Sequence, residues 1–121
     1  MSTRKDDVRL AKKIDFKELP ESLRRFVKSY PAVWSAHERL GIETARAGPL
    51  SERDIQLIKL AVSASQGMET SFKTHVEKAL RSGASEAEIE HAIVQLLPMI
   101  GMGKMMTAMK WYRERRKRRQ P

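Results

Sequence analysis

The stretch from Leu57 to His75 reads LIKLAVSASQGMETSFKTH and is the most informative part of the chain about its fold. Its apolar residues recur at helical spacing as far as Gly67, and a second helical pattern begins directly after this glycine. Met68, Ser71 and His75 follow the spacing i, i+3, i+7, which places them on one face of the second helix. The stretch therefore predicts two helices joined by a tight turn, with a histidine two turns into the second.

Helix-capping signals flank this hairpin on both sides. Ser51 opens an acidic turn that is typical of a helix N-terminus, and the helix is expected to run to about Gln66. Gly83 suits the end of the second helix, since glycine tolerates the left-handed backbone that often closes a helix. Ser85 and Glu88 have the spacing of a capping box, which predicts another helix after the hairpin.

Helical patterns account for the rest of the chain as well. Helices are expected after Pro20 and Pro31, and a last helix is expected after Gly101, while Pro98 must kink or end the helix that contains it. No segment alternates with period two over a strand length, so the predicted fold class is all-α. The expected organisation is a charged N-terminal arm over residues 1–15, a helical domain over 16–112 and a basic C-terminal tail over 113–121.

Composition restricts the chemistry. The 121 residues suit one domain, and their 40% apolar content supports a core of modest size, so association would add stability. The chain has no cysteine, which excludes disulfides, thiolate nucleophiles and cysteine-ligated zinc or iron–sulfur clusters. The first residues are charged and lack the apolar core of a secretory signal, and the longest uncharged stretch, 92–103, is too short to span a membrane. A cytoplasmic location is therefore predicted.

An ordered set of residues carries a family resemblance. The set consists of Leu57-Ile58-x-Leu60-Ala61-Val62-Ser63-Ala64, Gly67, His75, Ala79-Leu80-x-x-Gly83-Ala84-Ser85-x-x-Glu88-Ile89, Gln95 and Gly101. In this pattern residues 50–111 resemble the carboxymuconolactone decarboxylase family, which includes the alkylhydroperoxidase D-like proteins. The resemblance implies an all-helical bundle built on a two-helix hairpin, in subunits that assemble as trimers or hexamers.

The residues of the reactive face depart from both branches of that family. In the alkylhydroperoxidase branch this face carries a Glu and a Cys-x-x-Cys-x-x-x-His motif, and the corresponding residues here are Gln56, Met68, Ser71 and His75. Thiol peroxidase activity is therefore not expected. The decarboxylase branch needs no cysteine pair, but it usually has a Tyr and a Pro where this chain has Met99 and Gly103.

The resemblance favours cofactor-free proton transfer or decarboxylation on a small carboxylic acid or lactone. His75 would donate or accept the proton, Gln56 and Ser71 would position the substrate, and Met68 would line the site. The alternative interpretation of His75 is a partly buried histidine whose ring bonds a carbonyl or a glutamine. A Ser71–His75 contact for hydrolysis would lack a third orienting group. A non-catalytic binding or scaffold protein with the same fold is the second functional hypothesis.

Three further features each have two interpretations. Glu88 and His91 have a spacing used by metal ligands in helical bundles, but Glu88 also fits the capping box and no second ligand pair is visible, so no metal is expected. The methionines of the last third suggest a subunit interface more than a ligand site. Residues 110–121, which include the tail, carry +6 of the net charge of +9, and the tail either binds nucleic acid weakly or forms a solvated helix end.

Overall fold

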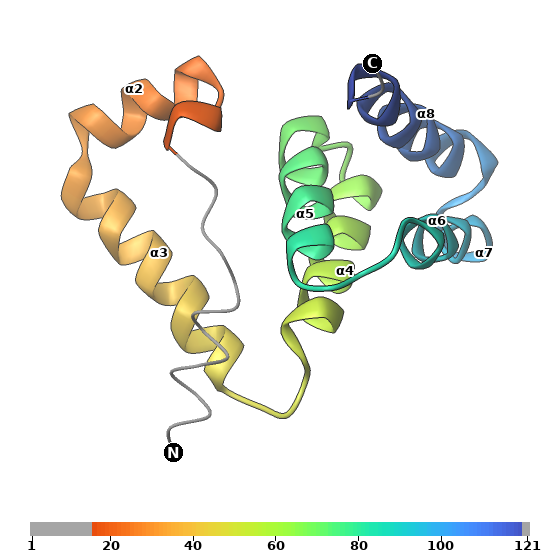
Figure 1. The fold of residues 1–121 in the computed structure, drawn as a ribbon, viewed down its shortest axis with the longest axis horizontal. Helices are drawn as coiled ribbons and strands as arrows, with labels where there is room; N and C mark the ends of the chain where they lie inside the picture. The colour runs from red at the N-terminus through yellow and green to blue at the C-terminus, as the bar shows by residue number, and fades with distance from the viewer. Residues whose placement is uncertain (1–15, 120–121) are drawn as a thin grey trace. The chain divides into compact units, whose positions relative to one another are not determined.

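The computed structural model describes residues 16–119, and every regular element within them is a helix (Figure 1). The predicted all-α class is thus confirmed for this part of the chain. The predicted charged arm, 1–15, and the last two residues of the predicted tail lie outside the described residues. The elements are η1 (Phe16–Glu18), α2 (Glu21–Ser29), α3 (Pro31–Arg46), α4 (Glu52–Ser65), α5 (Glu69–Arg81), α6 (Glu86–Val94), α7 (Leu97–Ile100) and α8 (Met102–Arg119).

The chain divides into two compact units, residues 1–50 and 51–121, and the division falls within the predicted 16–112 domain. In the described part of the first unit, Pro31 occupies the first turn of α3, where its missing N–H costs no hydrogen bond. Phe26 and Tyr30 stack with ring centroids 5.3 Å apart, yet neither α2 nor α3 buries a residue. The described residues of this unit therefore contain no core of their own.

The second unit begins with the predicted helical hairpin. The Ser51 hydroxyl accepts a hydrogen bond from the backbone N–H of Asp54 at 3.1 Å, as the capping signal predicts. Gly67 has φ of 71°, a left-handed conformation that lets the chain reverse between α4 and α5. The Met68 N–H then bonds the Ser63 carbonyl at 2.9 Å and closes the turn.

The chain after the hairpin follows the predicted signals. Ser85 and Glu88 form the capping box of α6, with both of its hydrogen bonds present. The helix ends at Val94, and Pro98 lies in the first turn of the short helix α7 rather than within α6. Gly101, with φ of 90°, leads into α8, which continues through the predicted basic tail as far as Arg119.

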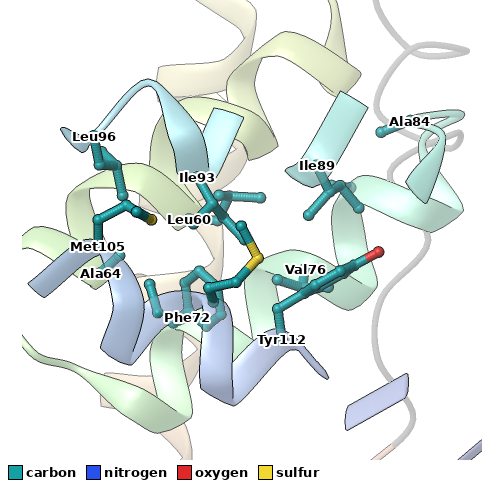
Figure 2. Close-up of a cluster of buried hydrophobic side chains, with 13 residues drawn as sticks. Leu60, Ala64, Phe72, Val76, Ala84, Ile89, Ile93, Leu96, Met105 and Tyr112 are labelled. Carbon is teal, nitrogen blue, oxygen red and sulfur yellow. The ribbon is translucent and has the colours of Figure 1, made fainter. Parts of the chain in front are cut away.

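The core of the second unit lies where α4, α5, α6 and α8 meet, and Figure 2 shows its side chains converging from these helices. Its largest fully buried members are Tyr112, Phe72, Leu60, Ile89, Ile93 and Val76. Burying one such aliphatic or aromatic side chain contributes roughly 1.5–3 kcal/mol, so the core fixes how α4 and α5 face each other.

Polar contacts reinforce this arrangement at the end of α8. Arg115 is buried and its Nε lies 2.6 Å from a carboxylate oxygen of Glu77 on α5. The Tyr112 hydroxyl bonds the Glu86 carboxylate on α6.

None of the helices described in residues 16–119 combines the length and the hydropathy that crossing a bilayer would require.

Candidate functional site: a polar seam between two helices

The candidate histidine is linked to α4 through a glutamine. His75 Nδ1 on α5 lies 2.8 Å from Gln56 Oε1 on α4. Gln56 is buried, and its Nε2 donates to Glu52 Oε1 at 2.7 Å, one turn earlier on α4. Three side chains from two helices thus form one hydrogen-bonded chain, Glu52–Gln56–His75. Both of the interpretations made from the sequence, a reactive histidine and a histidine bonded to a glutamine, agree with this contact.

The surroundings of His75 keep its ring neutral. Burial, followed by the positive charges of Lys78 and Lys59, lowers the pKa of His75 from 6.5 to about 4. Each of these causes disfavours the imidazolium, since a buried cation loses hydration and neighbouring cations repel it. At neutral pH His75 is therefore an uncharged ring that can accept a proton. The imidazolium form, which could donate one, is hardly populated.

The second predicted polar residue, Ser71, pairs across the same helix interface. Its hydroxyl lies 2.8 Å from that of Ser63, a buried residue on α4. No hydrogen bond joins Ser71 to His75 among the described residues. The serine–histidine contact that hydrolysis would need is therefore not formed here, and Ser71 instead bonds a hydroxyl of the facing helix.

Met68 lies apart from these hydrogen-bonded pairs. It is the residue that precedes the first turn of α5, and 49% of its surface is exposed. Its backbone is not helical, with φ of −93° and ψ of 84°, so the i, i+3 spacing to Ser71 does not extend the helix face to Met68. Helix α5 begins one residue later than predicted, which leaves Met68 at the rim of the hairpin turn.

The paired residues line up along the two helices. On α4 the side chains recur at i, i+4, i+7 and i+11, and on α5 at i, i+4 and i+7, so each set occupies one helix face. We call these seven residues the polar seam: Glu52, Gln56, Lys59 and Ser63 on α4, with Ser71, His75 and Lys78 on α5. Sequence reasoning missed Glu52, Lys59, Ser63 and Lys78. Their helical spacing relative to Gln56 and His75 is the signal that could have found them.

The other candidates from the sequence do not join the seam. His91 Nε2 contacts Gln95 at 2.9 Å, whereas Glu88 bonds Ser85 and Arg53, so Glu88 and His91 are engaged separately. No three histidine, cysteine or acidic side chains gather as a metal site within residues 16–119. In the basic tail, Arg115 is held by Glu77.

The methionine stripe divides between the interior and the surface. Met105 and Met109 are buried in the core, whereas Met99, Met102 and Met106 are 80%, 58% and 44% exposed. The buried pair supports the subunit itself. The exposed three leave apolar surface that a partner could cover.

Comparison with known proteins adds one finding. Residues 30–114 match the family model described as Carboxymuconolactone decarboxylase family, a span that contains both hairpin helices and the whole polar seam. Neither the curated proteins nor the solved structures contain a significant match to this chain.

Proposed function

The chain belongs to the carboxymuconolactone decarboxylase family, and on this premise we propose that it catalyses cofactor-free proton transfer or decarboxylation on a small carboxylic acid or lactone. The observation that carries the proposal is His75, a neutral imidazole held by Gln56 through Nδ1. Its other ring nitrogen, Nε2, would face the substrate. The family's thiol route needs cysteine, and the sequence contains none.

Proton transfer at carbon would use the lone pair on Nε2. His75 would accept a proton from a carbon next to the lactone carbonyl, and the C–H electron pair would pass into the carbonyl as an enolate. The imidazolium would then return the proton to a different carbon of the conjugated system. In a decarboxylation the C–C electron pair remains on the substrate as CO₂ leaves, and a proton that His75 has taken from solvent quenches that carbon.

Two lysines support an anionic substrate. Lys59 and Lys78 are both half-buried and close enough to His75 to lower its pKa. A carboxylate bound among these groups would offset their positive charge and raise the pKa of His75. Substrate binding itself would thereby favour the protonated imidazole that quenching needs. Gln56 and Ser71 would orient the substrate, and the half-exposed Met68 would contribute an apolar contact.

The experiment compares His75→Asn with His91→Asn, since His91 is an exposed histidine outside the seam. Turnover is measured as CO₂ release or loss of absorbance on a panel of unsaturated lactone carboxylates and β-keto acids. We expect the parent and His91→Asn to turn over the same member of the panel, and His75→Asn to lose about 100-fold or more in rate. Equal turnover by His75→Asn would refute the role of His75.

A second candidate function is a non-catalytic binding or scaffold protein. It is favoured by the hydrogen bonds that pair seam residues with each other, Gln56 with His75 and Ser63 with Ser71, because such pairs also hold two helices together. Titrating the protein with small carboxylates, together with the turnover assay, separates these functions. A catalytic site predicts that the NMR signals of His75 shift and that the ligand is turned over, a binding protein predicts the shift without turnover, and a scaffold predicts no change at the seam.

We also propose that the protein is a homo-oligomer in the cytoplasm. The exposed Met99, Met102 and Met106, together with a first unit that buries no residue in α2 or α3, leave apolar surface for a second subunit. Sedimentation equilibrium should give a mass of three or six chains. A monomer at micromolar concentration would contradict this part of the proposal.

A further inference from the structure

The polar seam contains one acidic residue, Glu52, for which the proposed function has no role so far. Glu52 is half-buried in the first turn of α4, where the helix dipole favours a carboxylate. Among residues 16–119, no hydrogen bond joins it to His75. Its hydrogen bond is to the Nε2 of Gln56, at 2.7 Å.

The chemistry of Glu52, Gln56 and His75 determines which atom donates each hydrogen bond between them. A carboxylate can only accept hydrogen bonds, so the end of the Gln56 amide that faces Glu52 must be the NH₂ group. The opposite end, which faces His75 Nδ1 at 2.8 Å, must then be the carbonyl oxygen. Because that oxygen can only accept, Nδ1 must carry a hydrogen.

A neutral imidazole has one N–H, so a hydrogen at Nδ1 leaves Nε2 as the basic nitrogen. If the amide were reversed, its oxygen would face the Glu52 carboxylate. Two hydrogen-bond acceptors would then face each other, and the buried Gln56 amide would lose its bond to Glu52. Free imidazole side chains in water prefer the other tautomer, with hydrogen at Nε2. The seam therefore stabilises the Nδ1–H tautomer, which the free ring disfavours.

We propose that Glu52 is a positioning residue: its carboxylate orients the Gln56 amide, and the amide holds His75 as the Nδ1–H tautomer with the free lone pair on Nε2. The consequence for catalysis rests on the proposed function, because a base at Nε2 matters only if substrate binds there. The tautomer itself is a property of the substrate-free protein and can be measured without turnover.

The experiment is long-range ¹H–¹⁵N NMR on the full chain at neutral pH, with the His75 signals identified by their loss in His75→Asn. The variants are Glu52→Ala and Glu52→Gln. The matched controls are Glu69→Ala and Glu69→Gln, because Glu69 also lies in the first turn of a hairpin helix but pairs with Lys73. The controls remove the same charge from an equivalent position without touching the seam.

We expect the parent and both controls to show the Nδ1–H tautomer. In Glu52→Ala the Nε2–H form should rise about tenfold or more, because the hydrogen bond that is lost is one to a charged carboxylate. Glu52→Gln should give a smaller rise, since its amide can accept from Gln56 or donate to it. Circular dichroism checks folding, and if the alanine variant does not fold, the glutamine variant decides the question.

A parent protein with hydrogen mainly at Nε2, or folded Glu52 variants with the parent's tautomer, would overturn the proposal. Failure of the proposed function looks different, because a chain without turnover could still show the tautomer shift. If turnover is found, folded Glu52 variants should lose kcat with KM largely unchanged, since Glu52 acts through Gln56 and His75.

Discussion

Replacing His75 with glutamine should change how the stability of the protein depends on pH. The folded protein holds the pKa of His75 at about 4, whereas the unfolded chain has the ordinary value of 6.5. Above pH 6.5 the ring is neutral in both states and contributes no pH dependence. Between these two values the unfolded chain binds a proton that the folded protein refuses, so the free energy of unfolding falls as the pH falls, and the loss levels off below about pH 4.

The size of the effect follows from the two pKa values. The full pKa shift would lower the free energy of unfolding, relative to neutral pH, by about 2 kcal/mol at about pH 5 and by about 3 kcal/mol at about pH 4. His75 is only partly buried, so solvent screening reduces this contribution, and we expect about half of each figure. A loss of about 1 kcal/mol at pH 5 is a measurable part of the stability of a small domain.

Urea unfolding between about pH 7 and pH 4 tests this directly, with the parent and His75→Gln compared at each pH. Other groups titrate in the same range, but they are common to both proteins, so the difference between the two curves isolates His75. The parent should lose more stability than the variant as the pH falls. Parallel curves would refute the argument that His75 is held neutral by its surroundings.

Four further variants test the site and the core and ion pair that support it. Gln56→Glu should raise the pKa of His75, since a carboxylate beside Nδ1 favours the imidazolium, and an unchanged NMR titration would count against the contact. Phe72→Ala should lower the free energy of unfolding by about 3–4 kcal/mol, because this side chain is fully buried. Met99→Ala should lower it by less than about 0.5 kcal/mol, because this side chain is 80% exposed. Similar losses for the two variants in urea unfolding would contradict the core assignment. Arg115→Met should cost about 2 kcal/mol by removing the buried ion pair with Glu77, and a stability equal to the parent's in thermal unfolding would argue against the ion pair.

Local chemistry made much of the second unit predictable from the sequence. The caps at Ser51 and Ser85 and the left-handed glycines at 67 and 83 act within a few residues of the chain. The helix ends around the hairpin therefore follow from the local sequence, to within one residue at the start of α5. The family resemblance over residues 50–111 lies within the region that the family model matches.

The partners within the seam were harder to predict because they depend on how α4 and α5 are rotated against each other. Ser63 belongs to the family pattern and shares a helix face with Gln56, but only the packed hairpin shows that it faces Ser71. Glu52 looked like an ordinary helix-dipole residue, and its bond to Gln56 depends on the side-chain conformations of both. Met68 was grouped with the site by spacing, but the backbone leaves the helix before reaching it.

Burial and the two lysines of the polar seam keep His75 neutral at neutral pH. The most direct test is an NMR titration of His75 in the full-length, substrate-free protein, followed through the ring carbon-bound protons. We expect a pKa of about 4, well below the ordinary 6.5, because burial and the charges of Lys78 and Lys59 oppose protonation. A measured pKa at or above 6.5 would contradict this expectation.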